Sequence, residues 1–406
     1  MLVILKNSFY DNSFIQNSET TFSKLWHEVV STHSEKLVRL KEFKFIHAHM
    51  KYPGWKHKSD IFRYIDREQL RQLIEGKNFF IFDGAAEGFS SVYEFPFFDM
   101  LYWNCKKYNV SPKRIIFLSA NHRDGEVLRR YAKARGLEPI HVFTYPSFEF
   151  VVAHDDEMIK LELDEHYKFV YEECQKQHTT KLFLSLSRVN RDHRSLASFM
   201  LWNSNLRDYA LMSQNTVSIE DVSSWRKSQN LHDYSDRQVL DWQSSLPLIV
   251  DQSNFEDNWA LSTVPYSNIH AQTIFQIVNE TIADDKNKTS LFYSEKTFRP
   301  IGQLQPFIIF GQPGCNHYLK KLGYKLYNDW FDLSFDFERD TTKRYKKLLA
   351  EVTRVTNLLN SMSKQQRIDW RFKNKEILFH NFNTMCSSAS TKKQFLNFMV
   401  NLSKNT

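Results

Sequence analysis

The residues best suited to chemistry lie in segment 294–301, where Glu295 and Lys296 are adjacent in a polar turn and Arg299 follows three residues later. An apolar, β-rich run at 306–310 comes next and ends at a glycine. A loop–helix–strand unit of this kind places backbone N–H groups and a cation where an anion can bind. The lysine can stabilise charge that develops on a departing diphosphate, and the glutamate can accept two hydrogen bonds from a ribose diol. The segment therefore predicts a phosphate site.

Two further groups of charged residues follow predicted strands of the second half. Arg188, Arg191 and Arg194 are spaced i, i+3, i+6, which would place them on one helical face with Arg188 near the N-terminus. Arginine suits bidentate phosphate contact, and Arg188 is the strongest candidate of the three. Glu280 ends a predicted strand at 275–278. The alternatives are a solvated basic helix start for the arginines and a surface or capping role for Glu280.

The segment 294–311 resembles a signature of glycosyltransferases with two Rossmann-like domains, the GT-B type. The α-1,3-fucosyltransferases and a group of phage and bacterial glycosyltransferase-like proteins carry a Ser/Thr-Glu-Lys element. It stands before a Pro-(Phe/Val)-(Ile/Val)-x-x-Gly strand. The run 185–194 is similar to the Ser-x-Asn-Arg start of the donor domain in the phage group, with Ser187 in place of asparagine. Pro300 departs from the fucosyltransferase pattern.

This resemblance covers roughly 181–310 and is faint before that. It implies that Glu280, Glu295, Lys296 and the arginines hold a nucleotide-sugar donor, and that the first domain presents an acceptor hydroxyl. It also implies an inverting transfer in which a carboxylate of the first domain removes the hydroxyl proton.

The candidate for that base follows a predicted strand at 79–82. Glu87 stands in the stretch 83–88 beside glycines that allow an unusual backbone path. Asp83 and His122 are the next candidates. The alternative, a polar turn with a capping acid, weighs about equally.

Alternating apolar strands and amphipathic helices predict an α/β fold with two Rossmann-like domains that face a central cleft. The predicted domains are an acceptor-side domain at 1–165, a helical connector at 166–180, a nucleotide-sugar domain at 181–375 and a C-terminal helix at 376–406 that returns to the first domain. The predicted strands are 79–82, 114–119, 139–143, 181–186, 267–269, 275–278, 307–310 and 322–326. The predicted helices are 95–108, 125–135, 164–177, 191–203 and a helical tail over 342–406.

Composition narrows the class of protein. A length of 406 residues suits two domains, and the net charge of +7 permits a polyanionic partner without requiring one. The cysteines are far apart and form no Cys-x-x-Cys pair, so they predict neither a zinc site nor a disulfide framework. No segment reaches the length of a membrane span. We expect a cytoplasmic protein, in the host cytoplasm if phage-encoded, with no metal site and no cofactor beyond the nucleotide-sugar co-substrate.

The sequence thus predicts a metal-independent, inverting glycosyltransferase that moves a sugar from a nucleotide-sugar to a hydroxyl of a glycan. Basic stretches at 106–107, 113–114 and 129–130 would suit an alternative, a phage-type DNA glycosyltransferase acting on a hydroxymethylated base. A non-catalytic nucleotide-binding protein is an alternative of another class. The sugar, the nucleotide base, the choice between glycan and DNA, the inverting or retaining outcome and the oligomeric state stay open.

Overall fold

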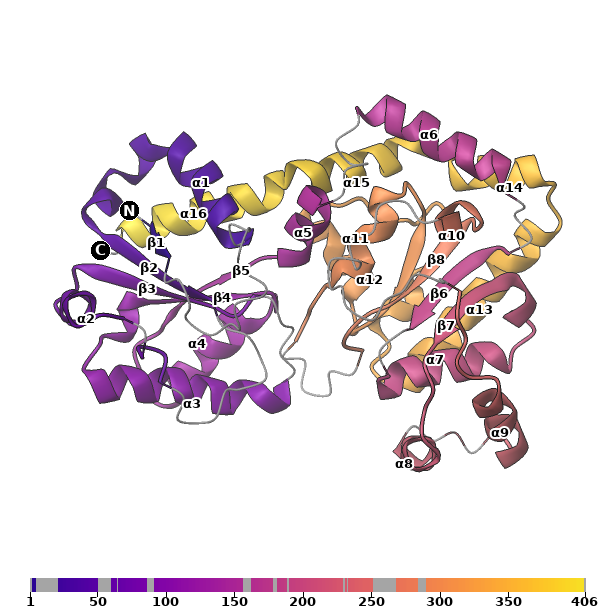
Figure 1. Ribbon diagram of the computed structural model, residues 1–406, viewed down its shortest axis with the longest axis horizontal. Coiled ribbons are helices and arrows are strands. Elements are labelled where there is room, and N and C mark those ends of the chain that lie inside the picture. Colours follow the sequence, from indigo (N-terminus) through magenta and orange to yellow (C-terminus); the bar gives the residue numbers. More distant parts are fainter. Residues whose placement is uncertain are drawn as a thin grey trace. The chain divides into compact units, whose positions relative to one another are not determined.

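The protein is described by a computed structural model (Figure 1). The structure describes residues 2–4, 21–49, 60–63, 65–85, 91–155, 162–177, 181–187, 190–228, 231, 233–250, 268–283 and 290–404. The chain forms two compact units. Unit 1 comprises Met1–Phe150, Asn287–Tyr293 and Ser388–Thr406, and unit 2 comprises Val151–Lys286 and Ser294–Ser387.

Unit 1 contains a five-stranded parallel sheet whose strands lie in chain order, β1-β2-β3-β4-β5. Strands β3 and β4 are buried throughout, as expected for strands of a parallel sheet covered on both faces. The strands are β1 Leu2–Ile4, β2 Lys44–His49, β3 Asn78–Asp83, β4 Ile115–Ser119 and β5 His141–Thr144.

Helices cover both faces of this sheet (Figure 1). Phe80 and Phe82 face a core that includes residues of α2, α3 and α4, such as Leu73 and Phe98. On the other face the α1 residue Trp26 packs against β2, and Phe395 near the chain's C-terminus packs against α1 and β5. The helices of this unit are α1 Thr21–Thr32, η1 Ser34–Glu42, α2 Arg67–Ile74, α3 Ser91–Tyr108, η2 Pro112–Arg114, α4 Asp124–Ala134 and α16 Ala389–Lys404; α5 Ser147–Asp155 leads into unit 2.

Unit 2 contains a four-stranded parallel sheet in the order β7-β6-β8-β9. The strand order reverses between β6 and β8, because β7 adds to one side of β6 and β8 to the other. Asn279 of β8 links the two strands at this point, because its side-chain amide donates to the hydroxyls of Ser185 and Ser187 of β6, each at 3.0 Å. The strands are β6 Phe183–Ser187, β7 Ala210–Gln214, β8 Phe275–Asn279 and β9 Phe307–Phe310.

The helices of unit 2 pack around this sheet or project beyond it, as α8 and α9 do (Figure 1). They are α6 Leu163–Lys176, α7 Asp192–Trp202, η4 Arg207–Tyr209, α8 Ile219–Ser228, α9 Asp236–Ser244, α10 Asn268–Ala271, α11 Glu295–Gly302, α12 Cys315–Tyr318, η6 Leu319–Leu322, η7 Ser334–Phe337, α13 Thr341–Asn360, α14 Lys364–Arg371 and α15 Lys375–Ser387.

The predicted α/β class with two parallel sheets is confirmed. The predicted strand at 267–269 is wrong, because 268–271 is the short helix α10. The predicted strand at 322–326 is also wrong, and the side chain of Asn381 on α15 explains why. This amide accepts from the Lys325 backbone N–H (2.8 Å) and donates to the Lys325 carbonyl (2.9 Å), so it takes the place of a neighbouring strand. The sequence analysis also missed β1, β2 and β7.

The C-terminal tail is not one helix. Helix α15 ends at Ser387, and Ser388 has a positive φ of +47°, a left-handed conformation that cannot continue an α-helix. Helix α16 then belongs to unit 1 while α15 belongs to unit 2. The predicted connector at 166–180 overlaps α6, which lies within unit 2. The predicted domain boundaries themselves stay predictions.

Candidate functional site

The centre of the site in unit 2 is the buried side chain of Glu280, directly after β8. Its carboxylate accepts hydrogen bonds from the backbone N–H groups of Thr281 (2.9 Å) and Ser294 (3.1 Å) and from the Ser294 hydroxyl (2.7 Å). The hydroxyl of Thr297, one turn into α11, donates to the same carboxylate. A buried carboxylate satisfied in this way holds the first turn of α11 in place.

The backbone carbonyl of Glu280 holds a second helix start. It accepts from His193 Nε2 (2.8 Å) and Arg194 Nε (3.2 Å), both in the first turn of α7. Arg194 also donates to the Thr281 hydroxyl (3.3 Å). The two helix N-termini are therefore tied to one residue. Since helix N-termini carry partial positive charge, the arrangement favours an anion nearby.

Glu295 and Lys296 form the first residues of α11, and Ser294 is the N-cap residue. The Lys296 ammonium lies 2.5 Å from Glu295 Oε1, and the two side chains are 26% and 13% exposed. Burial alone would raise the pKa of Glu295, but the charges of Lys296 and then Arg299 lower it below its usual value. Glu295 is therefore an ionised acceptor at neutral pH, beside cations that a ligand can still reach.

The predicted arginines have different positions. Arg191 is the exposed N-cap residue of α7 with an extended backbone, so the expectation that the arginines share one helical face is wrong. Arg194 is buried, and burial followed by the charge of Arg191 lowers its pKa to about 10, so it stays protonated at neutral pH. Arg299 is half-buried on α11. Arg188 lies outside the described residues.

The acceptor-side candidates of unit 1 lie at the carboxyl ends of its strands. Asp83 is buried, accepts from the Ala85 backbone N–H (3.0 Å) and lies 3.0 Å from His47 Nε2. The backbone N–H of His122 donates to the Leu291 carbonyl (2.8 Å), and burial lowers the pKa of its imidazole to about 4. Glu87, the first candidate for the base, lies outside the described residues.

The sequence analysis missed a buried acid beside His122. Asp124 begins α4, accepts from the side-chain amide of Asn121 (2.6 Å) and is hydrogen-bonded by the Ser119 hydroxyl. Burial raises the pKa of Asp124 to about 7, although these two hydrogen bonds oppose the shift. The sequence analysis also missed Ser294 and Thr297 as hydrogen-bond partners of Glu280. A serine before the acidic residue of a helix start is an N-cap signal that points to Ser294.

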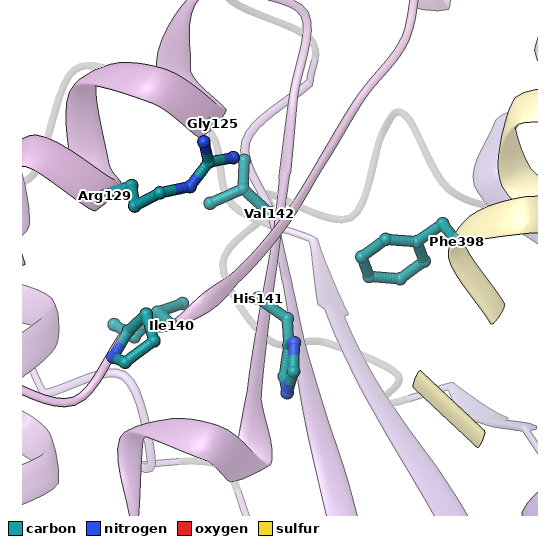
Figure 2. Close-up of a pocket in the computed structure, with 7 residues that line it drawn as sticks. Gly125, Arg129, Ile140, His141, Val142 and Phe398 are labelled. Carbon is teal, nitrogen blue, oxygen red and sulfur yellow. The ribbon is translucent and has the colours of Figure 1, made fainter. Parts of the chain in front are cut away.

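Unit 1 also has a pocket of about 250 Å³ that none of the predicted site residues lines. Figure 2 shows Arg129 of α4, His141 of β5 and Phe398 of α16 around it. The pocket is lined by the first half of β5, whereas Asp83 is the last residue of β3 and His122 lies three residues after the end of β4. We assign it no part in the predicted site.

Among the described residues no group of three or more His, Cys, Asp or Glu side chains could hold a metal ion. None of the described helices combines the length and the apolar character that crossing a membrane needs.

No protein-family model matches this sequence. No curated protein matches it either. Three solved structures resemble the chain, each at low sequence identity and over most of both chains. A trehalose-6-phosphate synthase, OtsA, has a TM-score of 0.40 with 10% identity and covers 98% of each chain.

The second structure, a glycosyltransferase from Rickettsia africae ESF-5, has a TM-score of 0.40 with 9% identity over 96% of this chain and 84% of that one. The third, trehalose-6-phosphate from E. coli bound with UDP-2-fluoro glucose, has a TM-score of 0.38 with 10% identity over 97% and 99%. All three TM-scores lie below 0.5.

Proposed function

We propose that this protein is a metal-independent, inverting glycosyltransferase that moves a sugar from a nucleotide-sugar to a hydroxyl of a glycan. The observation that carries the proposal is the set of contacts around Glu280. They fix the starts of α7 and α11 at the carboxyl edge of a sheet whose strand order reverses, where ligands of open α/β sheets bind.

On the donor side, Lys296 would contact the diphosphate and Glu295 the ribose diol. Lys296 is partly exposed at a helix N-terminus, where a phosphate also meets backbone N–H groups. Glu295 is ionised and accepts hydrogen bonds only, which matches the two hydroxyls of a ribose. Arg299, Arg191 and Arg188 would add positive charge around the phosphates.

The transfer balances without a further reactant. The acceptor oxygen bonds to the anomeric carbon while the bond from that carbon to the phosphate oxygen breaks, and the electron pair leaves with the nucleoside diphosphate. Lys296 stabilises the charge that develops there. Glu87 would take the acceptor proton, because Asp83 is buried against His47 while His122 is a poorly basic, enclosed imidazole.

A thermal-shift panel tests the donor part of the proposal. Uridine, guanosine, adenosine and cytidine diphosphates are added in excess EDTA to the full chain. At ligand concentrations about 100 times the dissociation constant, binding should add roughly 2.7 kcal/mol to the free energy of unfolding. Stabilisation that disappears in EDTA would contradict metal independence. No stabilisation by any of the four would contradict the donor site.

Transfer itself needs a product measurement. Incubation with the nucleotide-sugar of the stabilising nucleotide and a panel of glycans should release nucleoside diphosphate in step with glycosylated product. Tight nucleotide binding with neither transfer nor donor hydrolysis would favour the non-catalytic alternative.

A further inference from the structure

An aromatic side chain projects from unit 2 beyond the end of β9. Phe337 is 62% exposed. Its ring lies against Gly314, where a β-carbon would come within 3.4 Å of it. Gly314 has a φ of +85°, so both the space and the backbone conformation favour glycine. Phe337 is thus an exposed ring with a rigid backing.

The imidazole of His317 packs beside this ring, with ring centroids 4.6 Å apart. Its Nδ1 lies 2.8 Å from the buried carboxylate of Asp336, which also accepts from the backbone N–H of His317 (3.0 Å) and the side-chain amide of Asn316 (2.8 Å). A carboxylate only accepts, so Nδ1 carries the proton in the neutral ring and Nε2 is an acceptor. The His317 side chain is 36% exposed.

These residues belong to the same edge of the unit 2 sheet as the start of α11. Gly311, directly after β9, approaches Glu280 so closely that a β-carbon there would lie 3.3 Å from the Glu280 β-carbon. Gly314 then donates its backbone N–H to the Asp336 carbonyl (2.7 Å). The turn that leads into α12, the helix of His317, is therefore held between Glu280 and the segment that carries Phe337.

We propose that Phe337 and His317 form the nucleobase subsite of the donor site, with the base stacked on Phe337 and a base N–H donating to His317 Nε2. This inference rests on the proposed function. Bases stack on aromatic side chains because every base has a π-face. A flat ring with N–H groups on its edge matches an exposed, rigidly backed ring beside a fixed acceptor, and Asp336 positions that acceptor.

The test compares a ligand that has a base with one that lacks it. Titration calorimetry measures the binding of the stabilising nucleoside diphosphate and of inorganic pyrophosphate to the full chain. Phe337→Ala should weaken the nucleotide about fivefold to 150-fold, the usual range for losing one stacked base, and should leave pyrophosphate within twofold. Phe337→Tyr should restore nucleotide binding. His317→Ala should weaken the nucleotide and spare pyrophosphate.

Ile249→Ala is the matched control, since Ile249 is 68% exposed in the same unit. Unchanged nucleotide affinity in Phe337→Ala overturns the inference and leaves the donor site of Lys296 in place. Equal loss of nucleotide and pyrophosphate also overturns it, because the ring would then act on the whole site. Loss of glycan binding alone would make Phe337 an acceptor contact. A wild-type protein that binds neither ligand would overturn both this inference and the proposed function.

Discussion

The carboxyl edges of the two sheets differ in topology. The unit 1 sheet has its described strands in chain order, whereas the unit 2 sheet reverses between β6 and β8. A reversal sends the connections on its two sides in opposite directions, and the crevice left there is where ligands bind in open α/β sheets. The unit 2 sheet therefore has a reversal point at which a ligand can bind. The described strands of the unit 1 sheet have none.

The acidic side chains at the two edges also have different hydrogen-bond partners. In unit 1, Asp83 pairs with His47 and Asp124 with Ser119 and Asn121, all within the interior. In unit 2 the buried acid Glu280 supports helix starts, and the charged Lys296 beside it remains partly exposed. A buried acid that supports a helix start with a partly exposed cation distinguishes a binding edge from an edge whose acids are hydrogen-bonded by buried neighbours.

The largest effect should come from Glu87, which would give unit 1 a chemical role. Glu87→Gln should lower transfer by about 10²–10⁴-fold, the range for losing a general base, while donor affinity stays unchanged. Glu126→Gln, an exposed acid of the same unit, is the control. If Glu87→Gln transfers at the wild-type rate, the base lies elsewhere, and Asp83→Asn and His122→Gln become the next variants.

Glu280→Ala should have the next largest effect, on stability. It leaves the donors of Ser294 and Thr297 buried without their acceptor, and hydrogen bonds to a charged group contribute about 1.5–3 kcal/mol each. We expect a loss of about 3 kcal/mol or more in chemical denaturation and a parallel loss of nucleotide binding. Glu172→Ala, at an exposed position of α6, should cost less than about 1 kcal/mol. Equal losses of unfolding free energy in the two variants would show that Glu280 does not support the helix starts.

A further contrast is a pH dependence of the stability of unit 1. The pKa of Asp124 is raised from 3.8 to about 7, so between those values the folded state holds a proton that the unfolded state has released. Its contribution to stability is complete below about pH 4 and is lost as the pH rises to about 7. Asp124→Asn keeps both hydrogen-bonding partners and cannot titrate.

The melting temperature of Asp124→Asn minus that of wild type should therefore rise from pH 4 to pH 7 and level off above it. His122 contributes the opposite slope in both proteins, because its pKa is lowered, and so cancels in the difference. A flat difference across this range would show that Asp124 is ionised in the folded protein.

The sequence predicted the strands that carry the site and the Glu295–Lys296 pair, because apolar runs and helix-start signals are local. It named Glu280 as a candidate but did not show that its side chain is buried, because its hydrogen-bond partners Ser294 and Thr297 lie 14 and 17 residues away. The sequence does not show that Phe337, one of 34 phenylalanines, is exposed, because the exposure of a side chain depends on the whole fold. The prediction of a strand at 322–326 is wrong for a similar reason: the distant side chain of Asn381 forms the hydrogen bonds of the Lys325 backbone.

The most direct measurement of the central claim is nucleoside diphosphate release during transfer, in EDTA and at saturating donor, by wild type, Lys296→Ala, Arg299→Ala and Lys347→Ala. Lys347 is the control because it too forms an ion pair with an acid of unit 2. Removing a group that stabilises developing charge costs about 2.7–4 kcal/mol in the barrier. Lys296→Ala should therefore be about 10²–10³-fold slower, Arg299→Ala less impaired and Lys347→Ala unchanged. Equal rates for Lys296→Ala and wild type would contradict the account.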